Sequence, residues 1–368
     1  MAPESSVAEL TAALVRIDSR NPDLDPGGPG EGDVASFVAG WLAEAGLDVT
    51  VDEAAPGRPN VVGIARGSGG GRTLQLNAHM DTVGVAGMDD PFAGRIEAGR
   101  VYGRGAYDMK GSLAACMLAG ARAVRLGLRG DVVVTAVADE EVASVGTEAI
   151  VRAYGADAAI VTEPTEERLV LAHKGFAGFT IDVAGRAAHG SRPDLGIDAI
   201  ALMGDVLVRL RALGERLRTG PGHTLLGTGS VHASLIEGGQ EYSSYPASCR
   251  LTGERRMIPG ESDDLVRSEL EALLGDLDGA WELTMMRPPF EAAHDAEISV
   301  LVARHAGGPE VVGEPYWADS ALLQAAGIPT VVYGPRGEGA HAEVEWVDLA
   351  SLERCLEVYV AVATELCA

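Results

Sequence analysis

The chain has 368 residues, of which 46% are hydrophobic and 23% charged, so it has the composition of a globular protein and is long enough for two domains. Its 54 acidic residues outnumber its 29 basic residues and give a formal charge of -25. This excess argues against nucleic acid and against an anionic membrane surface as partners, because both are negatively charged themselves.

The first 174 residues alternate between helical and extended patterns. A first helix, capped by Ser5 or Ser6, ends near Ile17, and a second helix is expected at 32–45. The strands are expected at 49–51, 60–65, 73–77, 131–139 and 158–161, with a third helix that follows Asp108 and ends near Gly127. Such alternation predicts an α/β domain with a central, mostly parallel sheet.

The pattern changes near Lys174. A strand at 178–183 is followed by a helix at 197–213, strands at 229–236 and 247–256, a helix at 261–274 and a strand at 281–286. The order βαββαβ predicts a ferredoxin-like α+β sandwich, which we place at 175–291 as an inserted domain. Helices at 298–305 and 320–326 around a strand at 330–333 restore the first pattern. We therefore predict that 1–174 and 292–368 form one discontinuous α/β domain.

Acidic residues and a histidine follow the expected buried strands. They are His79 and Asp81, Asp108 in a glycine-rich loop, Glu140 and Glu141 after the run 131–139, and Glu163 in a turn. Singly, each is explained as a helix cap, a turn residue or a solvated strand end. Open α/β sheets, however, bind ligands at the carboxyl ends of strands, and buried carboxylates need a compensating cation.

Together these residues predict a site for two divalent metal ions. Nitrogen and oxygen ligands without a thiolate favour zinc, with cobalt or manganese as alternatives. Two such ions can activate a water molecule and polarise a carbonyl group. A carboxylate that is not a ligand would then move the proton.

The motifs agree in order and spacing with those of a known family. They are His79-Met80-Asp81, Gly103-Arg104-Gly105 with Asp108-Met109-Lys110-Gly111, Asp139-Glu140-Glu141, Glu163-Pro164-Thr165 and Ala340-His341-Ala342. In this set the chain resembles the dinuclear zinc hydrolases, the family of acetylornithine deacetylase, succinyl-diaminopimelate desuccinylase, aminoacylase-1 and carboxypeptidase G. The resemblance covers essentially the whole chain. It implies that the discontinuous α/β domain is the metal-binding catalytic domain and that the inserted domain is a dimerisation or lid domain.

The resemblance assigns the metal ligands. It implies that Asp108 bridges two metal ions. His79 and Glu163 would complete the ligands of one ion, and Glu141 and His341 those of the other.

Two further carboxylates belong to this site by the same resemblance. Glu140 matches the general base, which takes a proton from the attacking water and passes it to the leaving nitrogen. Asp81 matches the carboxylate that orients His79. The family also implies a non-proline cis peptide bond, here between Asp108 and Met109.

Residues of the inserted domain match family positions as well. His189 would hydrogen-bond the developing oxyanion in the active site of a partner subunit, although it could simply be a surface-loop histidine. Arg256 matches an arginine that binds the substrate's carboxylate, for which the guanidinium fork is suited, or it is an exposed strand residue. Ser243 stands where an asparagine is usual, so its role in substrate binding is left open.

The sequence thus predicts a cytoplasmic, homodimeric, metal-dependent amidohydrolase that removes an acyl group from an N-acyl amino acid, as acetylornithine deacetylase does. A desuccinylase, a dipeptidase or a carboxypeptidase acting on short peptides are alternatives within the family. A non-hydrolytic ligand-binding or scaffold relative is an alternative of a different class. We expect the cytoplasm because the N-terminal residues lack a signal pattern, no apolar run could span a bilayer, and the four cysteines are far apart.

Overall fold

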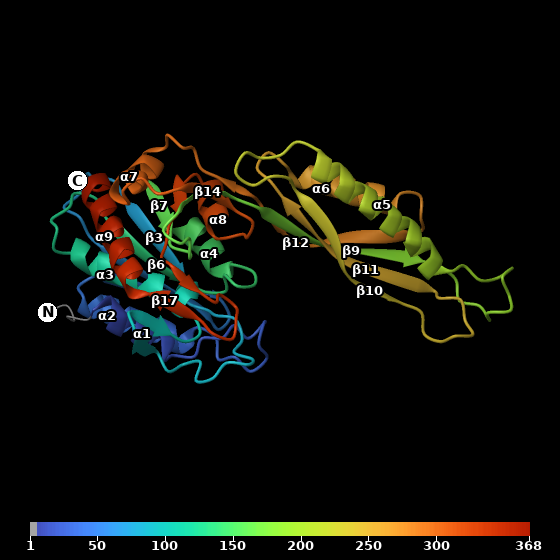
Figure 1. The fold of residues 1–368 in the computed structure, drawn as a ribbon, viewed down its shortest axis with the longest axis horizontal. Coiled ribbons are helices and arrows are strands. Elements are labelled where there is room, and N and C mark those ends of the chain that lie inside the picture. Colours follow the sequence, from blue (N-terminus) through green and yellow to red (C-terminus); the bar gives the residue numbers. More distant parts are fainter. Residues whose placement is uncertain (1–5) are drawn as a thin grey trace. The chain divides into compact units, whose positions relative to one another are not determined.

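The structure is a computed structural model, and it describes residues 6–368. The chain forms two compact units (Figure 1). Unit 1 consists of Met1–Leu171, Ala292–Val312 and Ala318–Ala368, and unit 2 of Ala172–Glu291 and Gly313–Trp317. Residues 172–174 and 313–317, which we expected in the first domain, therefore group with unit 2. Within residues 6–368, no helix has both the length and the apolar character of a membrane span.

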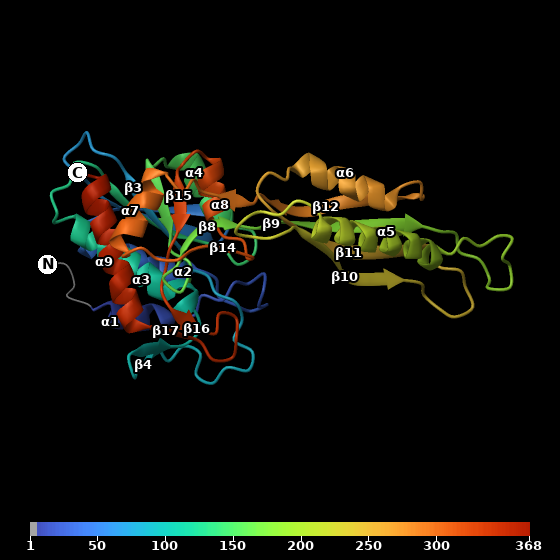
Figure 2. The ribbon, with the colours of Figure 1, turned by 45° about the horizontal axis from the view of Figure 1, so that its top comes forward.

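Unit 1 is built on a large sheet flanked by helices (Figure 2). Its helices are α1 (Val7–Val15), α2 (Gly32–Glu44), α3 (Gly111–Ala123), α4 (Val145–Ala153), α7 (Glu297–His305), α8 (Ser320–Ala325) and α9 (Leu349–Leu366). The strands of the large sheet are β1 (Asp48–Ala55), β2 (Arg58–Ala65), β3 (Leu74–His79), β6 (Val132–Val137), β7 (Ala158–Val161), β8 (Leu169–His173), β13 (Phe290–Glu291), β14 (Val311–Glu314) and β15 (Thr330–Val332). Of these strands, β13 and the last two residues of β8 and of β14 group with unit 2. A small second sheet, which the sequence did not predict, contains β4 (Arg95–Glu97), β5 (Arg100–Tyr102), β16 (Gly337–Glu338) and β17 (Trp346–Asp348).

The large sheet is mixed. Its strand order is β1-β2-β6-β3-β7-β15-β8-β13, and β14 pairs with β8. β3 is parallel to both β6 and β7, and β15 is parallel to β7. The pairs β1–β2, β2–β6, β8–β15 and β8–β13 are antiparallel, so the expectation of a mostly parallel sheet is corrected. The tight turn between β1 and β2 is too short for the crossover that a parallel pair needs.

The local sequence explains the central elements. β6 reads Val-Val-Val-Thr-Ala-Val and is buried along its whole length, as is β3, because helices cover both faces of parallel strands. Ser6 caps α1 in a capping box with Glu9, while the other expected cap, Ser5, lies outside the described residues. α3 begins only at Gly111, because the preceding segment Ala106–Lys110 is irregular.

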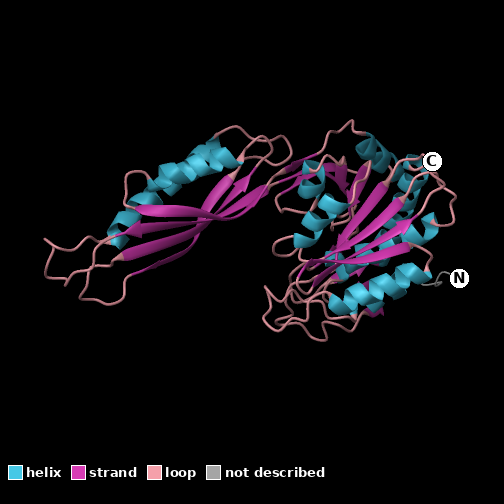
Figure 3. Ribbon diagram, turned by 180° about the vertical axis from the view of Figure 1, so that it is seen from behind, coloured by secondary structure: helices cyan, strands magenta, loops and turns pink. Residues whose placement is uncertain are grey.

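Unit 2 has the chain order βαββαβ, and its helices lie on one face of its sheet (Figure 3). Its elements are β9 (Gly175–Ala184), α5 (Ala199–Thr219), β10 (Ser230–Gly238), β11 (Ser248–Met257), α6 (Asp263–Leu274) and β12 (Gly279–Arg287). The strands form an antiparallel sheet in the order β10-β11-β9-β12. Along β9 the side chains alternate between buried and half-buried, as expected when one face packs on helices. Phe179 of β9, Val206 of α5 and Leu270 of α6 lie in the shared core.

Candidate metal centre

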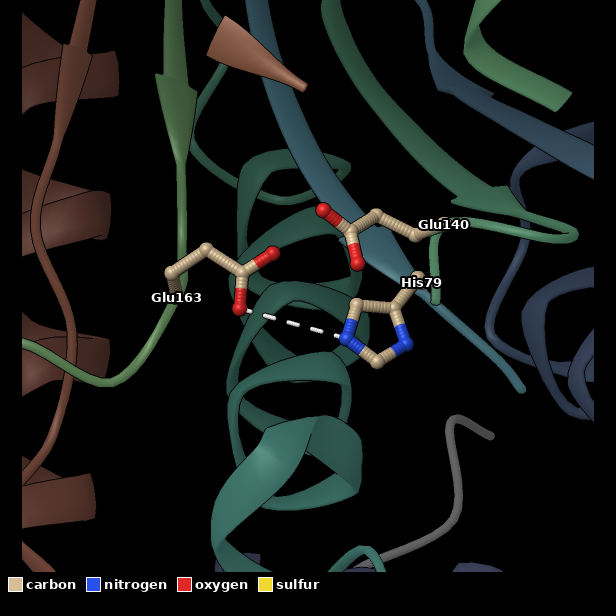
Figure 4. A group of neighbouring side chains, drawn as sticks. All are labelled: His79, Glu140 and Glu163. Carbon is tan, nitrogen blue, oxygen red and sulfur yellow. Dashed lines mark ion pairs between the residues drawn. The ribbon is translucent and has the colours of Figure 1, made fainter. Parts of the chain in front are cut away.

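The carboxyl ends of three neighbouring strands meet at one edge of the large sheet. His79 is the last residue of β3 and pairs in parallel register with Val137 of β6, and β7 lies on the other side of β3. Glu140 follows β6 and Glu163 follows β7. Parallel neighbours end at the same edge, so these side chains converge, and their carboxylates are turned toward the ring of His79 (Figure 4).

Two overlapping groups of side chains have possible ligand atoms within 4.8 Å of one another. One group is His79, Glu140 and Glu163, and the other is His79, Asp108 and Glu141. Nε2 of His79 lies 3.1 Å from Oδ1 of Asp108 and 3.9 Å from Oε2 of Glu163. The peptide bond between Asp108 and Met109 is cis, which confirms that prediction.

His341 reaches the same carboxylates from a loop between β16 and β17. Its Nε2 lies 3.4 Å from Oδ2 of Asp108 and 3.2 Å from Oε2 of Glu141. Asp108 therefore has one oxygen beside His79 and the other beside His341. The structure thus brings together all the residues that the resemblance assigns as metal ligands.

Asp81 does more than the sequence suggested. Nδ1 of His79 lies 3.0 Å from the backbone carbonyl oxygen of Asp81 and 3.5 Å from its Oδ1. The Asp81 carboxylate also accepts hydrogen bonds from the backbone N–H of Glu140 (3.1 Å) and of Glu141 (3.3 Å). It therefore fixes the turn that presents both glutamates as well as the imidazole.

The hydrogen bonds of His79 indicate that a proton or a cation lies between its Nε2 and the Asp108 carboxylate. A carbonyl oxygen only accepts, so Nδ1 carries the proton of that bond. Nε2 of a neutral ring would then direct its lone pair at the Asp108 carboxylate, an unfavourable contact unless a proton or a cation lies between them. In the absence of metal, burial lowers the pKa of His79, but the charge of Glu163 and hydrogen bonds to Asp108 and Asp81 outweigh it and raise that pKa well above its usual value.

The raised pKa values of the buried glutamates also indicate that the site lacks positive charge. Burial and the charge of Glu163 raise the pKa of Glu140 well above its usual value. Burial and the charge of Asp108 raise the pKa of Glu141, and burial also raises that of Glu163. Oε1 of Glu141 is buried without a hydrogen-bond partner. A set of oxygen and nitrogen donors with an unpartnered buried oxygen and excess negative charge fits divalent cations.

A buried network behind the site was not foreseen. Nδ2 of Asn21 donates to Oδ2 of Asp81 (2.8 Å) and to Oδ1 of Asp139 (3.0 Å). Asp139 has a left-handed φ of 67°, and its carboxylate also pairs with Arg58 at 2.9 Å. These contacts hold the turn that leads into Glu140. No local pattern marks Asn21, because it lies in an irregular segment and meets its partners only through the fold.

The site residues expected in unit 2 lie in two places. The backbone N–H of Gly190 donates to the carbonyl of Ser243 at 2.6 Å, so the loops of His189 and Ser243 are neighbours. Nδ1 of His189 lies 2.8 Å from Oγ of Ser191. Arg256 is near the opposite end of β11, where its Nη2 donates to Oε2 of Glu254 at 3.2 Å.

Comparison with known proteins gives consistent matches. Residues 75–365 match Peptidase family M20/M25/M40. The chain is 32% identical over 356 residues to the acetylornithine deacetylase of Myxococcus xanthus, covering 90% of this chain and 89% of that protein. It is 29% identical over 341 residues to the acetylornithine deacetylase of Proteus mirabilis (strain HI4320), covering 88% and 87%.

A solved structure has a similar fold. It is the Bacillus subtilis YXEP protein, described as a dinuclear metal binding peptidase from the M20 family. The TM-score is 0.75 at 16% sequence identity, and the match covers 98% of this chain and 97% of that chain.

The buried charges predict how the metal-free protein responds to pH. A carboxyl with a raised pKa binds its proton more tightly in the folded state, so stability increases as the pH falls through the folded pKa. The hydrogen bonds to Asp108 and Glu141 raise the pKa of His341 to about 10. Its stabilising contribution is complete below the usual value of 6.5 and is lost as the pH rises through about 10. Chelator-treated protein should therefore be more stable to urea at pH 6 than at pH 9.

Glu163→Gln provides the matched test. Burial raises the pKa of Glu163, so its charged form is disfavoured in the folded protein, and removing that charge should stabilise the chelator-treated protein at pH 8 by about 1 kcal/mol or more, the free energy of one pKa unit. Glu353→Gln, a change at an exposed position of α9, should have little effect. A Glu163→Gln protein that is less stable than wild type without metal would show that the carboxylates do not repel one another.

Proposed function

Since the chain belongs to Peptidase family M20/M25/M40, a family of metal-dependent hydrolases, we propose that it is a two-metal deacylase that releases the acyl group from N-acetylornithine or a closely similar N-acyl amino acid. The observation that carries this proposal is the convergence of His79, Asp108, Glu141, Glu163 and His341 on one edge of the sheet. Identity to two acetylornithine deacetylases over most of the chain supports the choice of substrate.

The ligand arrangement follows from the observed contacts. Asp108 would be shared, because its two oxygens face different histidines. His79 and Glu163 would hold one ion, and Glu141 and His341 the other. Zinc suits these donors best, with cobalt or manganese as alternatives. When bound, the ions would polarise the acyl carbonyl and make a nearby water more acidic.

Glu140 is the proposed general base. One of its carboxylate oxygens lies within 4.8 Å of ligand atoms of His79 and Glu163, which is close enough to exchange a proton with a water molecule among them. In the metal-free protein, burial and the charge of Glu163 raise the pKa of Glu140, and cations bound beside it would lower that pKa. Asp81 keeps the base in place through the backbone of the turn.

His189 and Arg256 are proposed to contact substrate, His189 at the oxyanion and Arg256 at the carboxylate, after Arg256 leaves Glu254. Within unit 2 they cannot reach one small molecule together. The loop of His189 adjoins the Ser248 end of β11, whereas Arg256 is near its other end. This ten-residue strand is about 30 Å long at its usual rise per residue. If both residues act on one substrate, they come from different copies of the chain.

A homodimer through unit 2 is therefore part of the proposal. β10 is one of the two outer strands of its sheet, and Leu235 and Ile236 on it are 63% and 52% exposed. Val208 on α5 is 57% exposed. A flat apolar edge strand is a template for another strand, and a second copy of β10 offers a self-complementary partner related by a two-fold axis.

The cytoplasmic location expected from the sequence also remains a proposal. The cysteines, Cys116, Cys249, Cys355 and Cys367, are all buried and unpaired. Unpaired thiols are usual in reducing compartments.

The substrate is tested with a panel of N-acetylornithine, N-succinyl-diaminopimelate and dipeptides. We expect N-acetylornithine to have a kcat/KM at least about tenfold higher than the others, the scale on which pocket contacts discriminate. Chelation should abolish turnover, and zinc or cobalt should restore it. Preference for a succinyl or peptide substrate would reassign the acyl group. A protein with bound metal that hydrolyses none of them would support the ligand-binding alternative.

Replacing Glu140 tests the base. Glu140→Gln should lower kcat by about 10²–10⁴-fold, because it removes the proton acceptor, while the metal content measured by elemental analysis stays at the wild-type value. Turnover near the wild-type rate in a metal-loaded Glu140→Gln protein would exclude this role.

Replacing an apolar residue of β10 tests the dimer. Ile236→Lys puts a charge on the exposed edge strand and should weaken the dimer at least about tenfold in sedimentation equilibrium. Leu265→Lys, at a 40% exposed position of α6, is the control and should not affect association. A wild-type protein that is monomeric at micromolar concentration would contradict this part of the proposal.

A further inference from the structure

Glu345 is a fully buried carboxylate that lies in the same loop as His341. Its Oε1 accepts hydrogen bonds from the backbone N–H of Tyr107 (2.9 Å) and of Asp108 (3.0 Å). Its Oε2 accepts from the backbone N–H of Gly105 (3.0 Å) and from Nη1 of Arg104 (2.6 Å). The side chain therefore binds the backbone of the loop that carries Asp108, and every described contact is a donor to a carboxylate oxygen.

Arg104 extends this contact to the other side of the site. It is 3% exposed, and its Nη2 donates to the carbonyl oxygen of Ala342 at 2.9 Å. Its Nε donates to the carbonyl of Gly84 at 3.0 Å. Ala342 directly follows His341, so the ion pair of Arg104 with Glu345 joins the backbone next to one proposed ligand to the backbone of another.

Regular structure does not hold either of these ligands. Asp108 has φ -117° and ψ 93° inside an irregular segment. His341 has a left-handed φ of 62°, and its side chain is 56% exposed. The nearest regular pairing is between β5 and β17, where Tyr102 faces Trp346. Directly beyond this pair the backbone N–H of Gly103 donates to the carbonyl oxygen of Glu345 at 3.1 Å, and the ion pair of Arg104 with Glu345 also joins the two loops.

The other side of the site is held differently. His79 is the last residue of β3, which pairs with β6 and β7 on both sides. Glu163 lies two residues beyond the end of β7. The residue between them, Thr162, still donates its backbone N–H to the carbonyl of Asn77 at 3.0 Å. The sheet itself therefore positions these ligands, and no contact to Glu345 is needed.

We propose that Arg104 and Glu345 are positioning residues that set the separation of Asp108 and His341, and so control the affinity of the cation site formed by Asp108, Glu141 and His341 more than that of the site containing His79 and Glu163. This inference rests on the proposed two-metal function. On this proposal the buried ion pair of Arg104 with Glu345 keeps the geometry of one metal site without taking part in the reaction.

Glu345→Gln is the sharpest test, because it keeps the volume of the side chain. Whichever way the amide is oriented, its NH₂ group would face N–H donors where a carboxylate oxygen now accepts them. Metal-free protein is titrated with Co²⁺ and followed by calorimetry and by the visible absorption of bound cobalt. We expect one of two binding steps to weaken by about 10–100-fold, the cost typical of losing a residue that orients a metal ligand, while the other step changes little.

A second variant covers the case in which Glu345→Gln does not fold. Arg104→Lys keeps the positive charge but cannot reach Glu345, Ala342 and Gly84 together, so it should weaken the same binding step. Glu269→Gln is the control. Glu269 pairs with the fully buried Arg255 at 2.9 Å in unit 2, so its loss removes a comparable ion pair without touching the metal site, and both steps should keep their affinities.

The outcomes separate the two proposals. Wild-type protein that binds fewer than two Co²⁺ ions contradicts the proposed function itself. Wild-type protein that binds two, together with folded Glu345→Gln protein that binds both with unchanged affinity, contradicts only the positioning role. If Glu345→Gln does not fold, unchanged affinities in Arg104→Lys contradict it, and equal weakening of both steps would do so as well.

Discussion

Negative charge buried at one edge of the unit 1 sheet is the constraint on which the rest of the structure depends. Asp108, Glu141 and Glu163 are brought together, and their ion pairs within residues 6–368 are with the imidazoles of His79 and His341. Such an arrangement is costly without cations, since buried charges need partners. The surrounding backbone N–H groups do not neutralise these ligands. The backbone N–H groups of Tyr107, Asp108, Glu140 and Glu141 bind Asp81 and Glu345 instead.

The candidate metal site could be predicted from the sequence because it is built on strand ends. His79, Glu140 and Glu163 each follow an apolar run, and parallel neighbours necessarily end together. His341 does not follow a predicted strand, so only the resemblance to a known family identified it as a proposed metal ligand. The direction of the outer strands was not predictable, because hydrophobic pattern does not give it and the antiparallel pairs β2–β6 and β8–β15 join strands that are far apart in the chain. The role of Glu345 was not predictable either, since its partners are backbone groups more than two hundred residues away.

The two units differ in architecture, and each architecture places its proposed site residues in a different way. In unit 1, parallel strands covered by helices deliver side chains to one edge, and irregular loops add the remaining ligands. Unit 2 is a single open antiparallel sheet whose helices cover one face, and β10 and β12 are its outer strands. The length of that sheet keeps His189 and Arg256 apart. If His189 and Arg256 both contact one substrate, as we propose, they must come from two copies of the chain.

The buried cysteines have a practical consequence. Burial raises the pKa of the Cys116 thiol to about 12 and that of Cys367 to about 11, and the thiolate is the form that reacts with alkylating reagents. The native thiols should thus remain inert to maleimide dyes while the protein is folded. A single cysteine introduced on an exposed surface would then be labelled selectively, so fluorescence or spin probes can be attached without first deleting the natural residues.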